Sequence, residues 1–422
     1  MGRCMTKTAI IPVFKMCEDD ELRARSFLAV GGISVLERQL RQCRLVGVEK
    51  VILLTDQLYD LTQRALKKFH YIPKQVSLAT KAEELSAMLS PEDQVLLLEE
   101  GVLQDTNTLK GVVAHSEEVL VFFGDDAACT GINYAQAVSN EEGHDQRFAS
   151  IGLLTMKRVQ EALKNGVNQF WDSLFQEAKD VARPTIGLKD LTAKSDAPFW
   201  RPLASETQEA AATKALLRRV ESDQSDWISQ SLHKNAEMSI ATLLNRFPLR
   251  TMVLMILAVG MGLGASWAFY MGHIGLGLAG GLLYSLLWGT AQKISFVHKT
   301  MQQSQPLLRV VDQLIESSWL MLLAWSLVAV LQDHTPWILM AMTILFSWAI
   351  QNQLNLYKSH TGRDLYYEGR FGKWLGLWVS TRVTRLWLMV IAAFFISWLW
   401  IPWVLASYTA LSFFIVQYRS AR

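Results

Sequence analysis

Six long apolar stretches in the second half of the chain constrain its fold more than any other feature. They cover residues 252–271, 274–291, 308–331, 336–356, 386–400 and 401–416 of the 422. A helix needs about 20 mostly apolar residues to cross the hydrocarbon core of a bilayer. The last two stretches are short and nearly continuous, and only Pro402 indicates a hinge between them. We therefore expect six membrane-spanning helices within residues 251–422.

The distribution of Lys and Arg among the connecting segments predicts how these helices are oriented. The links after the second and fourth stretches and the C-terminal tail carry the basic residues, namely Lys293, Lys299, Arg309, Lys358, Arg363, Arg370, Lys373, Arg382, Arg385, Arg419 and Arg422. The other three links contain neither Lys nor Arg. Because cytoplasmic links carry an excess of both residues, we expect an integral protein of the inner or plasma membrane with both termini in the cytoplasm. The alternative, a buried helical core of a soluble protein, leaves this alternation unexplained.

The first half of the chain has the mixed, charged composition of a soluble domain. The apolar runs "TAIIPVF", "KVILLT", "DQVLLLEEGVL" and "EEVLVFFGDD" alternate with helical patterns, the first of which stops at Gly47 and the second of which covers residues 58–69. This alternation predicts an α/β domain with a mostly parallel sheet up to about residue 156. Helices are expected over 156–179 and 205–220, and an amphipathic juxtamembrane segment over 221–250 is expected to lie on the cytoplasmic leaflet.

Net charge, the first residues and the cysteines limit the cellular compartment and the binding partners that we expect for this protein. A net charge of +2 gives no reason to expect nucleic-acid binding. The first residues, "MGRCMTKTAIIPVF", lack the pattern of a cleavable signal peptide. The four cysteines, Cys4, Cys17, Cys43 and Cys129, all lie in the first half and form no CxxC pair. We therefore expect reduced cytosolic thiols and no zinc site.

Two segments of the first half, "FLAVGGISVLERQLRQCRLVGVEKVILLT" and "FWRPLASETQEAAATKALLRR", resemble sugar-phosphate nucleotidyltransferases. The resemblance covers about the first 220 residues. It implies a nucleotide-binding site in which Arg25 takes the place of the family lysine and Gly31 and Gly32 form the glycine turn. It also implies a glycine-rich loop after the first strand, whose backbone N–H groups hold the nucleotide phosphates.

The chain departs from that family at the residues that nucleotide transfer needs. The loop after the first strand reads "FKMCEDDELRARS", which has no glycine and carries a run of acidic residues that repel phosphate. The metal-binding aspartate of the family corresponds to Gly101, and Glu99 or Glu100 replaces it only with a shift in register. A second expected aspartate, just after Trp200, is absent.

The segment "SDWISQSLHKNAEMSIATLLNRFPLRT" joins the two halves of the chain. It looks like the juxtamembrane region of CDP-alcohol phosphotransferases, which also have six spans. The order of the parts resembles bifunctional inositol-phosphate cytidylyltransferase/phosphotransferase proteins. In that family the pattern DxxDG, xxAR, GxxxDxxxD supplies four aspartates that bind divalent metal, and the last aspartate acts as the base. In this chain Lys293 replaces the arginine, Asp312 and Glu316 correspond to the third and fourth aspartates, and Trp288 stands where an earlier one belongs.

Asp312 and Glu316 are thus the residual candidates for catalysis and for metal binding. They are four residues apart and share one helix face. In the alternative interpretation they form a polar face at the cytoplasmic start of a helix, where acids suit the helix dipole, and pair with Lys293 or Arg309.

The sequence predicts an α/β nucleotidyltransferase-like N-terminal domain (1–220), juxtamembrane amphipathic helices (221–250) and a six-helix transmembrane CDP-alcohol phosphotransferase-like domain (251–422). The leading hypothesis is a non-catalytic partner or regulator in phospholipid or polar-headgroup synthesis. Its expected partners are the lipid bilayer, a lipid-synthesis enzyme and, by the resemblance, a second copy bound through membrane helices. One alternative is an active phosphotransferase that uses Mg or Mn at Asp312 and Glu316. Another is a lipid or anionic-ligand binder in which Arg382 and Arg385 contact lipid phosphate.

Overall fold

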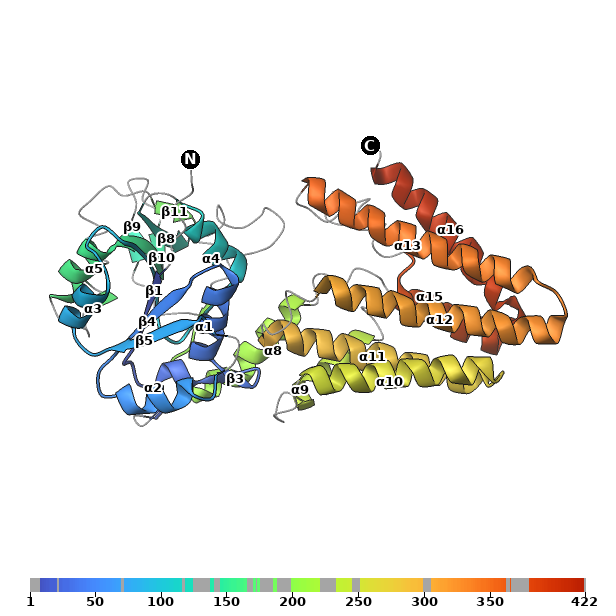
Figure 1. The fold of residues 1–422 in the computed structure, drawn as a ribbon, viewed down its shortest axis with the longest axis horizontal. Helices are drawn as coiled ribbons and strands as arrows, with labels where there is room; N and C mark the ends of the chain where they lie inside the picture. The colour runs from blue at the N-terminus through green and yellow to red at the C-terminus, as the bar shows by residue number, and fades with distance from the viewer. Residues whose placement is uncertain are drawn as a thin grey trace. The chain divides into compact units, whose positions relative to one another are not determined.

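The structure is a computed structural model of the chain. It describes residues 8–20, 23–69, 72–115, 118–123, 137–139, 145–164, 170–171, 173–174, 185–187, 199–220, 233–244, 251–298, 305–361, 365 and 379–420. The chain divides into two compact units, Met1–Thr213 and Lys214–Arg422. Each unit is described by itself, first the α/β unit and then the helical unit (Figure 1).

The α/β unit is built on a mixed sheet. Its described strands are β1 (Thr8–Val13), β2 (Ala29–Val30), β3 (Ile33–Ser34), β4 (Lys50–Thr55), β5 (Gln75–Ala79), β6 (Gln94–Leu98), β7 (Val102–Gln104), β8 (Val119–Phe123), β9 (Ala137–Ser139), β10 (Asp145–Thr155), β11 (Thr185–Gly187) and β12 (Trp200–Pro202). The main sheet has the order β11-β8-β10-β6-β1-β4-β5, with β9 beside β10. β1 is parallel to β4 and β6, whereas β10 is antiparallel to β6, β8 and β9. The α/β class is therefore confirmed, but the sheet is mixed because β10 enters it with reversed direction.

Helices cover both faces of this sheet. They are α1 (Val35–Leu45), α2 (Tyr59–Leu66), α3 (Ala82–Met88), α4 (Thr106–Val113) and α5 (Met156–Leu163). A further helix, α8 (Glu209–Val220), spans the boundary between the two units. Side chains of β1 alternate between the faces, so Ala9 and Ile11 pack with α1 and α4, while Ile10 packs with α3 and α5. The predicted helix over 156–179 is described as α5, and most of its remainder lies outside the described residues.

Local sequence signals explain why α1 and β4 follow each other as predicted. The Ser34 side chain caps α1 by accepting a hydrogen bond from the Glu37 backbone N–H at 3.2 Å. Gly47 follows the helix with φ +89°, a conformation that a residue without Cβ adopts easily. The chain then enters β4 at Lys50, in parallel register with β1.

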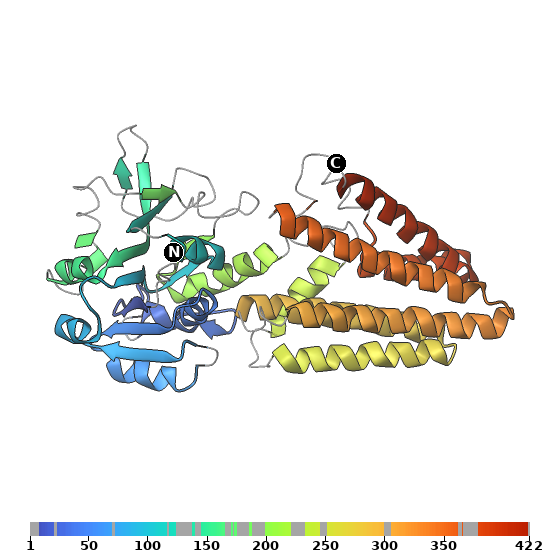
Figure 2. The ribbon, with the colours of Figure 1, turned by 45° about the horizontal axis from the view of Figure 1, so that its top comes forward.

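The helical unit consists of long helices packed side by side (Figures 1 and 2). Its described elements are α9 (Lys234–Leu244), α10 (Thr251–Tyr270), α11 (Ile274–His298), α12 (Gln305–Leu331), α13 (Thr335–Thr361), α15 (Arg382–Ile391), the π-helical η9 (Ala392–Ser397), η10 (Trp398–Trp400) and α16 (Ile401–Ser420). α10 packs against α11 and α12, α12 against α13, and α13 against α16. α11 additionally contacts α9 and α15.

Four helical segments in the described part of the chain are long and apolar enough to cross a membrane. They are Thr251–Tyr270, Ile274–His298, Leu307–Leu331 and Arg382–Ser420. Their outward surfaces suit lipid, because large apolar side chains are exposed there, with Phe394 and Phe395 at 79% and 84%. These helices are compatible with the membrane protein that the sequence predicts.

The predicted six spans are only partly represented among these four segments. The fourth predicted stretch lies in α13, whose last turns carry Gln351, Asn352 and Asn355 and so lower its hydropathy. The last two stretches fall in Arg382–Ser420, where Ser397 interrupts the helix with extended backbone (φ −179°, ψ 143°). The Ser380 and Thr409 hydroxyl oxygens lie 3.3 Å apart, so the chain folds back on itself at this interruption. The hinge therefore lies before Pro402, which occupies the first turn of α16.

Candidate functional site

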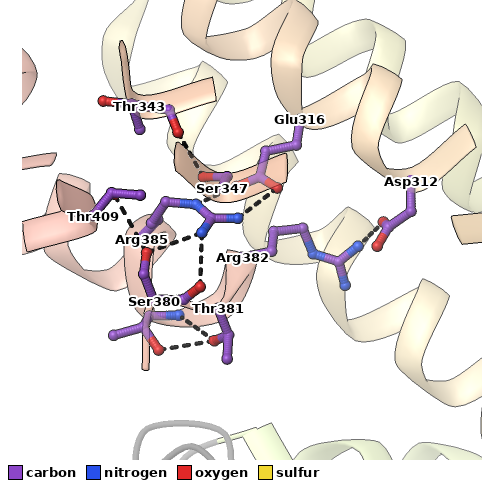
Figure 3. A network of polar contacts seen from close by, with 10 residues as sticks. Asp312, Glu316, Thr343, Ser347, Ser380, Thr381, Arg382, Arg385 and Thr409 are labelled. Atoms are coloured by element: carbon purple, nitrogen blue, oxygen red, sulfur yellow. Dashed lines mark hydrogen bonds and ion pairs between the residues drawn. The ribbon is translucent and has the colours of Figure 1, made fainter. Parts of the chain in front are cut away.

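An acidic side of α12 faces a basic side of α15 (Figure 3). Asp312 and Glu316 come from α12, and Arg382 and Arg385 come from the first turn of α15. Arg385 forms two parallel bonds to Glu316, Nε to Oε1 at 2.6 Å and Nη2 to Oε2 at 2.8 Å. This bidentate geometry is the strongest form of an arginine–carboxylate pair.

The backbone before α15 holds the Arg385 guanidinium in place. Its Nη1 donates to the Ser380 carbonyl oxygen and to the Ser380 hydroxyl, both at 2.9 Å. Thr381 caps α15 by accepting from the Thr384 N–H at 3.2 Å. Arg385 is buried, so the Glu316 pair is a fixed part of the packed helices.

Asp312 has a second set of partners. Arg382 forms an ion pair with Asp312 Oδ1, and the Tyr284 hydroxyl of α11 donates to the same oxygen at 2.6 Å. The Arg382 guanidinium also lies over the Tyr284 ring, 5.0 Å from its centroid. Both acids are therefore neutralised by α15, and not by Lys293 or Arg309 as one interpretation of the sequence suggested.

The two pairs line a polar cavity of about 290 Å³ between α12, α13 and α15. Amide side chains of α13 and α12 complete the wall, among them Gln313, Gln351, Asn352 and Asn355. Arg309 also lines the cavity and donates to the Asn355 amide oxygen at 3.1 Å. Three arginines and two carboxylates give this wall a formal charge of +1.

Lys293 lies away from this cavity, in a buried cluster between α9 and α11. Its Nζ is 2.7 Å from Glu237 Oε2, and both side chains are at most 4% exposed. A Cβ at Gly289 would lie 2.2 Å from Glu237 Oε1, so the glycine makes room for the carboxylate. His233 Nδ1 lies 3.9 Å from the same carboxylate.

In the α/β unit, the structure brings Glu100 into the loop that was expected to hold phosphate. β1 and β6 are parallel neighbours, so the residues that follow them meet at one edge of the sheet. The Glu100 carboxylate accepts from the backbone N–H groups of Phe14 at 2.9 Å and Lys15 at 2.8 Å. The Ser26 hydroxyl donates to it at 3.2 Å, and Glu100 is 2% exposed. Burial raises the pKa of this carboxyl group to about 8.

The other residues expected at the nucleotide site have structural partners. The Arg25 guanidinium donates to the Met16 carbonyl oxygen at 3.0 Å and pairs with Glu18 at 3.2 Å. Gly31 and Gly32 form the turn between β2 and β3 with φ values of +64° and +82°.

Gly101 cannot be replaced easily by an acidic metal ligand. Its φ is +70°, and a Cβ would lie 2.9 Å from the Arg25 Cβ and 3.1 Å from the Leu203 carbonyl oxygen. Among the described residues, no group of three or more His, Cys, Asp or Glu side chains is arranged to hold a metal ion. A Mg or Mn site at Asp312 and Glu316 stays a prediction, and in this structure both acids face arginines.

Sequence reasoning missed three contributors to these sites. Glu100 was considered only as a substitute metal ligand, and its hydrogen bonds to Phe14 and Lys15 depend on strand register. Tyr284 carried no sequence signal. Glu237 is the last acid before a long stretch without any, up to Asp312, and that isolation was the one available signal.

No protein-family profile matches this chain, and no curated protein matches it. Among solved structures it is similar to the inositol-1-phosphate CTP transferase from T. maritima, with 13% identity and a TM-score of 0.38 over 49% of this chain and 92% of that one. It is also similar to the UDP-glucose pyrophosphorylase from Acinetobacter baumannii, with 14% identity and a TM-score of 0.34 over 50% and 93%. The UTP-bound form of that enzyme matches with 12% identity and a TM-score of 0.35 over 50% and 92%. All three are nucleotidyltransferases, and at these TM-scores the likeness carries no conclusion about activity or ligands.

Proposed function

We propose that this protein is a membrane protein of phospholipid or polar-headgroup synthesis that acts without catalysis, as a partner or regulator of another enzyme. The proposal is supported by the pairing of both candidate acids, Asp312 and Glu316, with arginines of α15. It includes six spans, cytoplasmic termini and a homodimer as expectations from the sequence. The α/β unit contributes a binding or docking surface in this proposal.

The arginine pairs oppose metal binding for an electrostatic reason. Mg²⁺ prefers several oxygen ligands at short distance in near-octahedral geometry. Here each carboxylate already has a guanidinium partner, and Arg385 occupies both oxygens of Glu316. A divalent cation at the same carboxylates would lie beside two positive side chains, and their repulsion opposes its entry.

Thermal unfolding of the purified protein in detergent tests this proposal. We expect no metal-dependent change of melting temperature with Mg²⁺ or Mn²⁺ plus CTP, CDP or a CDP-alcohol. A metal-dependent rise that is lost in Asp312→Asn would instead support the active phosphotransferase. A rise that Asp312→Asn retains would place a nucleotide site elsewhere and would equally overturn the proposal.

A double variant distinguishes a catalytic role of Glu316 from a purely structural one. Single neutralisation of Glu316 leaves Arg385 buried without its partner, so loss of function in that variant has two explanations. The double variant Glu316→Gln with Arg385→Gln removes both charges and keeps polar side chains. In a complementation assay the non-catalytic role should survive the double variant, whereas an enzyme that uses Glu316 should be inactive.

The cavity between α12, α13 and α15 favours a second candidate function, the binding of an anionic lipid headgroup. Two observations support this function: the cavity wall has a formal charge of +1, and it is rich in amide side chains that can donate hydrogen bonds. Arg309 is exposed and its hydrogen-bond partner, Asn355, is neutral, so Arg309→Gln leaves both ion pairs intact. In nanodiscs containing phosphatidylglycerol this variant should retain less bound lipid than the wild type. Equal retention in both proteins would exclude this binding mode.

A further inference from the structure

The main sheet of the α/β unit has an open edge at β5. In the described part of the chain, β5 pairs with β4 on one side and ends the strand order of the sheet. An edge strand directs backbone N–H and C=O groups outward, where a further strand can pair with them. β5 therefore offers a hydrogen-bonding edge along Gln75–Ala79.

A groove of about 470 Å³ lies beside this edge, between α2 and β5. Tyr59, Gln63 and Leu66 line it from one face of α2, and Val76 and Leu78 line it from one face of β5. Leu66, Val76 and Leu78 pack against the core of the unit but are only partly buried. The groove therefore has an apolar floor that is open to solvent.

One end of the groove is basic. Lys67 follows the last residue of α2, Lys74 precedes β5, and both are exposed residues of the groove lining. Since residues 67–74 connect α2 to β5, the two lysines lie at the same end of the groove, where β5 begins. The described lining residues include no Asp or Glu, so the lining carries a formal charge of +2. Complementary charge gives an interface its specificity, and this end of the groove favours an acidic occupant.

The open edge, the apolar floor and the basic end together define one kind of occupant. An extended peptide that pairs with a sheet edge gains affinity from main-chain hydrogen bonds and specificity from pockets for alternate side chains. We propose that the α2–β5 groove binds an extended segment of a partner protein, with apolar residues at alternate positions and acidic residues at one end. The apolar side chains lie on Val76 and Leu78, and the acidic end lies at Lys67 and Lys74.

This inference rests on the proposed function, in which the α/β unit contributes a docking surface for another protein. The two can fail separately. Metal-dependent nucleotide binding would overturn the non-catalytic function without changing the affinity of the groove for a peptide. Absence of peptide binding would overturn the groove proposal and leave the metal and nucleotide measurements as they are.

The probe is a short fluorescent peptide in which valine and threonine alternate and one end carries glutamates. Two versions, with the glutamates at the N-terminal or the C-terminal end, distinguish parallel from antiparallel addition to β5. A third peptide repeats the tighter-binding sequence with N-methylated backbone amides, which keep the side chains but cannot donate to a strand. Fluorescence anisotropy measures the affinity of each peptide for the full-length protein in detergent.

The protein variant is Lys67→Glu with Lys74→Glu. Its matched control is Lys157→Glu with Lys164→Glu, which makes the same change of net charge at two exposed lysines of α5 and its C-terminal end. We expect the wild type and the control to bind the peptide equally. The groove variant should bind it at least about tenfold more weakly, because two ion pairs become two repulsive contacts. The N-methylated peptide should also lose at least about tenfold in affinity for the wild type.

Several results would overturn the proposal. They are absence of peptide binding to the wild type, equal affinities of the groove variant and the control, and equal affinities of the methylated and unmethylated peptides. Displacement of the peptide by sodium phosphate, and not by sodium chloride at equal ionic strength, would assign the groove to a small anion instead. Self-association of the wild type that the peptide reverses would identify a second copy of this chain as the occupant, which equally contradicts the proposal.

Discussion

At the residue scale, the sites of this protein are formed by carboxylates and donor groups that are far apart in the sequence and lie in contact within the same unit. Glu316 pairs with the Arg385 guanidinium across 69 positions of sequence, and Glu100 accepts a hydrogen bond from the Lys15 backbone N–H across 85. The spacing of Asp312 and Glu316 predicted that they share a helix face, and both line one cavity. Their partners could not be predicted, because the packing of α15 against the bundle depends on tertiary contacts that no local pattern records.

Glu100 should make stability depend on pH. Burial, with a smaller contribution from Glu99, raises its pKa from 4.5 to about 8, against the lowering effect of the Lys15 and Phe14 donors. Between these values the folded chain holds a proton that the unfolded chain releases, so stability should fall as pH rises from about 4.5 to about 8. The melting temperature of the wild type should therefore drop more between pH 6 and pH 8 than that of Glu100→Gln. An identical drop in both proteins would show that Glu100 does not titrate in this range.

The Glu316–Arg385 pair should show strong coupling between its members. Their side chains are 13% and 5% exposed, so removal of one partner leaves a nearly buried charge. We expect Arg385→Gln to lower the free energy of unfolding by about 3 kcal/mol, and the double variant with Glu316→Gln to recover most of it. Unfolding in mixed detergent micelles compares Arg385→Gln, Glu316→Gln and the double variant with the wild type. Additive losses would mean that the pair is not coupled.

At the scale of elements, segments with strong local signals were predicted well. β1, α1 and β4 were predicted from apolar runs, a helical pattern and the stop at Gly47, and the structure confirms each of them. β10 was missed because "DQRFASIGLLT" mixes charged, small and apolar residues, and its antiparallel pairing is a property of the whole sheet. The hinge before α16 lies at Ser397, which no sequence signal marked.

The contact of α9 with α11 depends on the absence of a side chain at Gly289. Gly289→Ala would place a Cβ 2.2 Å from Glu237 Oε1 and displace the carboxylate that Lys293 holds. We expect a loss of about 1–2 kcal/mol in the free energy of unfolding. Gly264→Ala on α10 is the control, since its Cβ would meet nothing within 4 Å, and it should be neutral or slightly stabilising. Equal effects of both substitutions would contradict a specific contact at Gly289.

At the scale of the whole molecule, the basic links predict that the tail and the links at His273 and His334 lie on opposite sides of the membrane. His273 and His334 are exposed at helix ends. In sealed vesicles of one orientation, a membrane-impermeant maleimide should label His273→Cys and His334→Cys from one side and Ser420→Cys from the other. The wild type gives the background from its own cysteines. Labelling of positions 334 and 420 from the same side would contradict the six-span arrangement.

The two units share one property. In each of them, buried or partly buried carboxylates form hydrogen bonds or ion pairs with other groups of the same chain. In the α/β unit Glu100 is held by backbone N–H groups, and in the helical unit Asp312 and Glu316 are held by arginines. Each arrangement reduces the charge available to a ligand. Both arrangements support the non-catalytic role that we propose.

The glycine at position 101 limits which residues the chain can accept between β6 and β7. Left-handed backbone and close approach to Arg25 and Leu203 oppose a side chain there. Aspartate at this position would therefore strain the fold before its carboxylate could reach a metal ion, and the neighbouring segments would have to move first. One substitution alone is thus a poor way to build a metal site into this edge of the sheet, and a designer would have to rebuild the loop together with the ligand.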